Sequence, residues 1–170
     1  MMFVRTRTRS LQRGSSSRSL SSLLSVWPAS SLIDQEVRVT GSELEAGMRV
    51  RLETRLEDSE AGWEFKSLCD YQTDSVGQFS TASQPPLPGS HYSGLHTSGP
   101  LWSLRPGPGS RSRLWPEDIR RSLQYELSLS CPQSGEVLTT ARAEKYFITR
   151  AVRRLEVREG PLRAVLFHPP

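Results

Sequence analysis

The chain has 170 residues, of which 35% are hydrophobic, and it carries a formal net charge of +4. This length suits one domain with an additional tail, and the hydrophobic share is low for a chain that is folded throughout. The charge is unevenly spread: residues 1–33 hold five arginines and no acid, whereas the remainder carries 17 basic and 18 acidic side chains. A nucleic-acid partner is therefore not expected, because phosphate binding needs a basic patch on the folded domain. No stretch has 18 consecutive apolar residues, so we expect no membrane span.

Residues 1–32 form a tail that is rich in arginine and serine. Leu20, Leu23, Leu24 and Trp27 follow the i, i+3, i+4, i+7 spacing of one helical face, so we expect a disordered or weakly helical tail. Such a composition is typical of a mitochondrial presequence, which predicts a mitochondrial location. A basic tail without a targeting role, in a cytoplasmic protein, is the alternative. A secretory signal fits less well, because the apolar run is short and interrupted by serines.

Apolar and polar residues alternate in five stretches of the region 33–150. Turn residues such as Asp, Ser and Gly separate most of these stretches, which are residues 37–40, 49–57, 63–71, 123–131 and 137–148. A period of two is typical of half-buried antiparallel strands. Strands separated by turns at about ten-residue intervals predict an all-β fold, an antiparallel β-sandwich over residues 33–150.

The region between the third and fourth of these stretches, residues 83–113, is rich in proline and glycine. We expect a long connection whose apolar residues, Leu101, Trp102 and Leu104, dock onto the sandwich. Cys69 and Cys131 occupy apolar positions of predicted strands, which favours buried free thiols. A disulfide between them stays open, and it would favour a secreted immunoglobulin-like domain.

The sequence offers no recognisable catalytic motif. It contains no GxSxG nucleophile elbow, no CxxC, and no Cys/His cluster with zinc spacing. His91 and His96 lie in the Pro/Gly-rich connection and are expected to be solvated, and His168 follows the last apolar run. The carboxylate pairs at residues 57–58 and 117–118 fit turns or helix starts better than acid–base dyads. We therefore predict no catalytic residue, no metal ligand and no cofactor site in this chain.

Four stretches in this order resemble the N-terminal portion of one family. They are LIDQEVRVTGSELEAGMRVRLETRLED (residues 32–58), YQTDSVGQFS (71–80), GSHYSGLHTSGPLWSLRP (89–106) and EKYFITRAVRRLEVREGPLRAVLFHPP (144–170). Together they resemble the acyl-CoA thioesterase and bile acid-CoA:amino acid N-acyltransferase family. The resemblance implies an immunoglobulin-like β-sandwich followed by a larger α/β-hydrolase domain, which carries a nucleophile, an aspartate and a histidine. None of these three catalytic residues falls within the matching stretches.

The end of the chain reads as a hairpin, with strands near residues 155–157 and 162–167 on either side of Gly160 and Pro161. The resemblance implies that residues 151–170 begin the α/β-hydrolase domain, which would be a partner in cis. Left uncovered, this hairpin would expose backbone groups and an apolar face.

The resemblance implies that the full-length thioesterase acts on acyl-CoA, which it hydrolyses to free fatty acid and CoA. We therefore expect the non-catalytic N-terminal domain of such an enzyme. A non-enzymatic β-sandwich interaction module, or a short isoform, is the alternative. Whether the chain alone is an enzyme stays open, and so does the choice between water and an amino acid as acyl acceptor.

Overall fold

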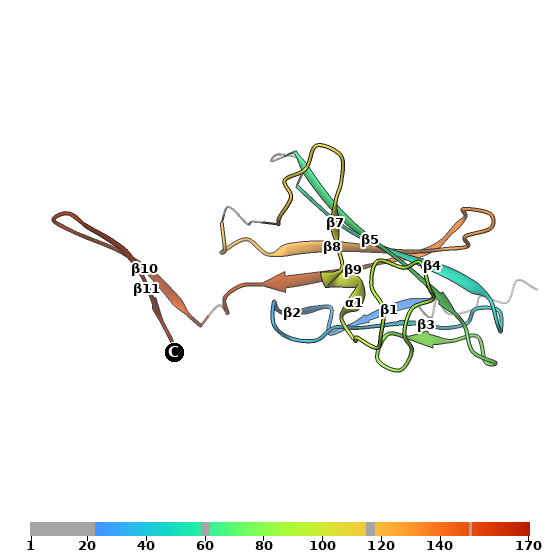
Figure 1. Ribbon diagram of the computed structural model, residues 1–170. Helices are drawn as coiled ribbons and strands as arrows, with labels where there is room; N and C mark the ends of the chain where they lie inside the picture. Colours follow the sequence, from blue (N-terminus) through green and yellow to red (C-terminus); the bar gives the residue numbers. More distant parts are fainter. Residues whose placement is uncertain (1–22, 59–61, 115–117, 150) are drawn as a thin grey trace, which may run out of the picture.

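The computed structural model describes residues 23–58, 62–114, 118–149 and 151–170. Two layers of strands pack against each other, and a separate hairpin extends from them (Figure 1). One layer is a three-stranded sheet with the order β1 (Leu24–Trp27), β3 (Arg38–Gly41) and β6 (Phe79–Ser80). The other is a six-stranded sheet with the order β2 (Ser30–Leu32), β9 (Val137–Tyr146), β8 (Leu123–Ser130), β4 (Arg49–Asp58), β5 (Trp63–Gln72) and β7 (Arg105–Pro106).

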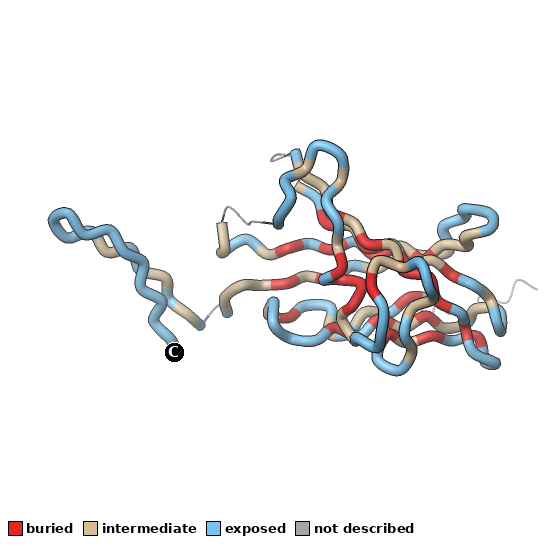
Figure 2. Tube along the Cα trace, in the orientation of Figure 1, coloured by how far each residue is buried: buried red, intermediate tan, exposed pale blue. Residues whose placement is uncertain are grey.

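The hydrophobic core lies between these two sheets, as the buried segments in Figure 2 show. Alternation along β4 buries Val50, Leu52 and Leu56 and leaves the arginines between them outside. The ring of Tyr71 on β5 stacks on that of Phe79 on β6 with centroids 4.9 Å apart, which joins the two sheets directly. The described residues also hold no helix long and apolar enough to cross a bilayer. The all-β prediction is thus confirmed.

The chain changes sheets near its beginning. β1 pairs antiparallel with β3, and after the cis bond between Trp27 and Pro28 the chain enters β2, which pairs parallel with β9. The expectation of a short helix through Leu24 and Trp27 is therefore wrong. The expectation of a purely antiparallel sandwich is also wrong at this one pair of strands. Residues 24–27 and 30–32 belong to the sheets although we assigned them to the tail, and residues 1–22, with Leu20, lie outside the described residues.

The Pro/Gly-rich connection runs along β5 and carries the short helix α1 (Gly99–Trp102), which contacts β4 and β5. Leu101 is buried in the core and Leu104 packs against it. The expected docking of the connection onto the sandwich is confirmed for Leu101 and Leu104. Trp102 differs, because 57% of its surface is exposed.

The C-terminal hairpin consists of β10 (Arg153–Glu159) and β11 (Leu162–His168), which pair antiparallel. They form a sheet of their own that shares no strand with the two sheets of the sandwich. Every residue of β11 is exposed, and Figure 2 shows the hairpin without buried segments. The predicted hairpin is confirmed, and its position leaves both faces open.

Candidate functional site

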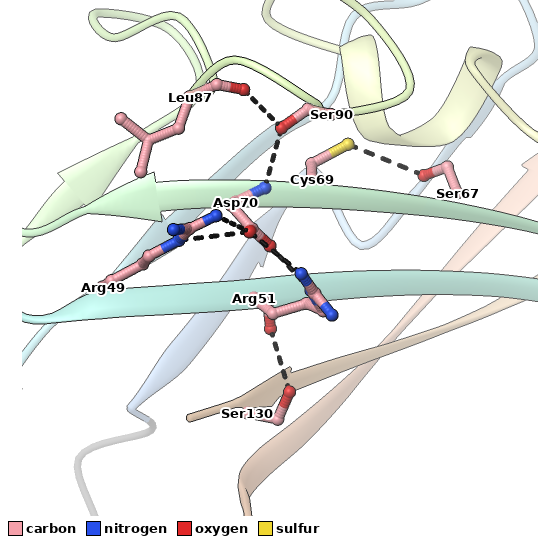
Figure 3. Close-up of polar contacts among 8 residues, drawn as sticks. All are labelled: Arg49, Arg51, Ser67, Cys69, Asp70, Leu87, Ser90 and Ser130. Carbon is pink, nitrogen blue, oxygen red and sulfur yellow. Dashed lines mark hydrogen bonds and ion pairs between the residues drawn. The ribbon is translucent and has the colours of Figure 1, made fainter. Parts of the chain in front are cut away.

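The densest polar cluster lies on the outer side of the β4–β5 pair (Figure 3). Asp70 is only 6% exposed and accepts bonds from Arg49 Nη2 at 2.6 Å and Arg51 Nε at 2.7 Å. Hydrogen bonding from the Arg51 guanidinium holds the pKa of Asp70 below its usual value. The backbone N–H of Asp70 donates to Ser90 Oγ, which in turn donates to the Leu87 carbonyl. The cluster therefore ties the Pro/Gly-rich connection to the sheet and leaves its carboxylate engaged with two guanidiniums.

The three histidines differ in their burial and surroundings. His91 is half-buried rather than solvated, and burial lowers its pKa. His96 is exposed, as expected, and its ring lies edge-on to Trp102 with centroids 5.3 Å apart. His168 is exposed at the end of β11. Among the described residues no hydrogen bond joins a serine hydroxyl to any of these rings, so they form no serine–histidine pair.

The two cysteines are free thiols, so the disulfide that the sequence left open is not formed. Cys69 is fully buried as predicted, and burial raises its pKa, which makes it a poor nucleophile. The prediction is wrong for Cys131, which is half-exposed just after β8. Hydrogen bonds from the backbone and side chain of Ser134 lower the pKa of Cys131. Within the described chain neither thiol has an imidazole partner.

Metal binding finds no support in the arrangement of side chains. In the ranges that the structure describes, no group of three or more His, Cys, Asp or Glu residues could hold a metal ion. Of the carboxylate pair at residues 117–118, the first residue lies outside those ranges. Asp118 itself is described, and its carboxylate pairs with Arg120 at 2.7 Å on the surface.

The apolar face of the C-terminal hairpin is the clearest candidate for a functional surface. In the register of β10 and β11, Leu155 lies opposite Leu166, and Glu156 lies opposite Val165. Opposite residues share a face, so the hairpin has one apolar face and one face with most of the charges. The apolar face carries Leu155, Val157, Leu162, Ala164 and Leu166, with Arg153, Glu159 and His168 at its two ends; the other carries Arg154, Glu156, Arg158, Arg163, Val165 and Phe167.

Three of the hairpin's charged side chains pair with one another, whereas no other part of the described chain covers its apolar face. Glu156 pairs with Arg154 at 2.9 Å and with Arg158 at 3.4 Å. Leu155, Leu162 and Leu166 are each about half exposed. An exposed apolar strand face of this kind marks an interaction surface or an aggregation risk. We call the apolar face of β10 and β11 the hairpin face.

Comparisons with known proteins point to one family. A family model described as the acyl-CoA thioester hydrolase/BAAT N-terminal region matches residues 34–159. Human acyl-coenzyme A thioesterase 1 is 36% identical over 140 residues, which cover 81% of this chain and 32% of that protein. Mouse acyl-coenzyme A thioesterase 3 is 37% identical over 142 residues, covering 82% of this chain and 32% of the relative.

Human acyl-coenzyme A thioesterase 2, mitochondrial, is 36% identical over 140 residues, which make up 28% of its length. The chain therefore spans about a third of the length of the curated relatives it matches. The matched region includes both sheets of the sandwich from β3 onward and extends to the end of β10. The chain belongs to the acyl-CoA thioester hydrolase/BAAT family and corresponds to its N-terminal region.

Proposed function

We propose that this chain is the non-catalytic N-terminal β-sandwich domain of an acyl-CoA thioesterase. The observation that carries the proposal is the family match over residues 34–159, together with relatives that are about three times as long. We infer that the sandwich is of the immunoglobulin-like type. A supporting feature is that the chain passes from one sheet to the other between β1 and β2. In the complete protein, acyl-CoA and water would yield free fatty acid and CoA.

The catalytic residues of that reaction belong to an α/β-hydrolase domain in cis. There a nucleophile would form an acyl-enzyme, and hydrogen-bond donors in an oxyanion hole would stabilise the tetrahedral intermediate. The sandwich contributes its rigidity and its position beside that domain. No residue of the described chain is assigned a step in the chemistry.

The hairpin face is the part of this chain that packs against the hydrolase domain. Its large side chains are about half exposed, so covering each of them contributes about 1 kcal/mol. Pairing of the open edges of β10 and β11 with strands of that domain would also protect them from pairing with other chains. Docking at this site explains why an apolar hairpin stands outside the core of the sandwich.

A mitochondrial location is supported by two observations. The first is the arginine- and serine-rich composition of residues 1–32, which contain no acid. The second is that human and mouse acyl-coenzyme A thioesterase 2 are named as mitochondrial. Other relatives carry no such word in their names, so a cytoplasmic location is the alternative.

A chimera tests the proposed role. Human acyl-coenzyme A thioesterase 2 would be prepared intact, without the region that this chain matches, and with that region replaced by residues 24–168 of this chain. We expect acyl-CoA hydrolysis to be lost on deletion and restored by the replacement. A folded chimera that is no more active than the deletion would contradict the proposal and favour a separate interaction module.

Two variants of the chimera test the hairpin face itself. Leu155→Asp with Leu166→Asp places carboxylates on the face at opposite positions, and burying them would cost several kcal/mol. Val165→Lys is the control, because it lies on the other face opposite Glu156. We expect the double variant to lose activity and the control to keep it. Equal activity of the two would show that the hairpin face is not the docking surface.

A further inference from the structure

A pocket of about 340 Å³ lies on the sandwich, and its lining includes no residue of the hairpin. Its walls come from three places: residues 33–36 after β2, residues 95–102 of the Pro/Gly-rich connection with α1, and Tyr125 and Lys145 on β8 and β9. Two polar side chains that are almost completely buried therefore line one cavity. The hydrogen-bond donors that Lys145 and Tyr125 do not use within the protein indicate what the pocket could bind.

Lys145 is 3% exposed, which is unusual for an ammonium without a carboxylate in hydrogen-bond contact. Its Nζ donates to the Leu32 carbonyl at 3.0 Å and to the Gln35 carbonyl. A lysine ammonium has three donors, so one is left without a partner among the described residues. The arrangement fixes Nζ at the pocket wall and keeps a positive charge there, although burial lowers the pKa of Lys145.

Tyr125 is the second donor. The residue is 5% exposed, no hydrogen bond from its hydroxyl is found among the described residues, and the hydroxyl oxygen is not enclosed, so it stays open to the pocket. Burial raises its pKa to about 12, so the hydroxyl keeps its proton at neutral pH. In the β8–β9 register Tyr125 lies opposite Ala143, and Lys145 lies opposite Leu123. Tyr125 and Lys145 are thus diagonal neighbours on one face, a separation that long and aromatic side chains can span.

The rest of the pocket wall combines apolar surface with two acids and with the polar residues Gln35, His96, Thr97 and Ser98. Leu101 is buried in the core, whereas Trp102 and Leu95 are more than half exposed. Asp34 and Glu36 also line the pocket, and both are exposed. These two carboxylates disfavour a dianion such as a phosphate ester, and Asp34 lies close enough to Lys145 to raise its pKa, whereas Lys145 and Tyr125 each keep a donor that one acceptor could use.

From this arrangement we propose that the pocket binds a small monocarboxylate with an apolar body. The ligand's carboxylate accepts hydrogen bonds from Lys145 Nζ and the Tyr125 hydroxyl, and its apolar part lies against Leu101 and Trp102. A ligand with a single negative charge can accept hydrogen bonds from both donors, and Asp34 repels it less than it would repel a dianion. This site does not depend on the role proposed for the hairpin face.

The test uses the full chain and benzoate as the probe, with phenyl phosphate as a dianion and benzyl alcohol as an uncharged analogue. Lys66 and Lys145 are the only two lysines of the sequence, so their ¹⁵N ammonium signals are readily assigned with Lys66→Met. We expect benzoate to shift the Lys145 signal and not that of Lys66. An unmoved Lys145 signal, or equally strong binding of either analogue, would overturn the proposal.

Tyr125→Phe is the deciding variant, since the hydroxyl it removes has no partner to lose among the described residues. Benzoate affinity should fall about tenfold, because a hydrogen bond to a charged group is lost. The Lys66→Met protein serves as the matched control and should bind benzoate as the original chain does. Unchanged affinity in Tyr125→Phe would overturn the assignment of this donor and of the site.

Discussion

Replacing Gly77 by alanine is expected to lower the free energy of unfolding by about 3 kcal/mol. Gly77 has a φ of +75°, a conformation that costs a residue with a Cβ about 1–2 kcal/mol. A Cβ at this position would also stand 2.9 Å from the backbone carbonyl carbon of Leu44, and closer still to the oxygen. Backbone atoms cannot rotate away as a side chain can. The turn is held in place by the Leu44 N–H, which donates to the Gly77 carbonyl at 3.2 Å.

Gly135→Ala is the matched control for this prediction. Gly135 has nearly the same φ, +73°, but a Cβ there would meet nothing within 4 Å. It should therefore show the conformational cost alone, about 1 kcal/mol. Urea unfolding of the three proteins, followed by tryptophan fluorescence, gives both differences. Equal costs for the two glycines would contradict the close approach of Leu44 to Gly77.

The second large effect is expected for Asp70→Asn, which should lower the free energy of unfolding by about 2 kcal/mol at pH 7. The carboxylate is nearly buried and accepts four hydrogen bonds, two from Arg49 and two from Arg51. A neutral amide cannot replace these charge-assisted bonds. The arginine side chains are about half exposed, so water partly solvates them after the change, which limits the cost.

The pH dependence of this difference distinguishes a charge effect from a packing effect. The folded-state pKa of Asp70 lies below its ordinary value, so its contribution to stability is fully present above about pH 4–5. It is lost as the pH falls through the folded-state pKa. The gap between the original chain and Asp70→Asn in urea midpoint should therefore be constant from pH 7 to pH 5 and narrow toward pH 3. A gap that stays constant to pH 3 would contradict this origin.

Asp118→Asn is the control, because it removes a carboxylate–arginine pair on the surface instead of a nearly buried one. Hydrogen bonding from Arg120 lowers the pKa of Asp118 to about 2, but the pair lies on the surface. Solvent and salt screen such a pair, so its removal should not measurably move the urea midpoint.

Much of the fold could be predicted because alternation is informative in long strands. β4, β5, β8 and β9 each run for eight residues or more, long enough for a period of two to be distinguished from a helical period. β1 has only four residues, and within it both Leu24 and Trp27 fit a helical face. Pairing with β3 makes this segment a strand instead of a helix, and as a strand it places Leu24 in the core and Trp27 outside.

The hairpin face and the pocket differ in how much of each can be predicted from the sequence. The hairpin face is visible in sequence, because one turn joins two adjacent strands whose alternation can be read directly. The pocket is not, because its walls come from segments near residues 33, 98, 125 and 145 that only the folded topology brings together. One signal was available: Lys145 follows Ala141 and Ala143 at an inward position of its strand. A charged residue at such a position indicates either a buried ion or a functional site.

We propose that the catalytic residues of the thioesterase lie in its hydrolase domain, so the purified, folded chain should not release CoA from acyl-CoA. The measurement that tests it most directly is the release of CoA from acyl-CoA by the purified, folded chain, followed with a thiol reagent. The rate should equal that of buffer and of the heat-denatured protein at every acyl-CoA concentration. A rate that rises with protein concentration, saturates with acyl-CoA and disappears on denaturation would contradict the claim.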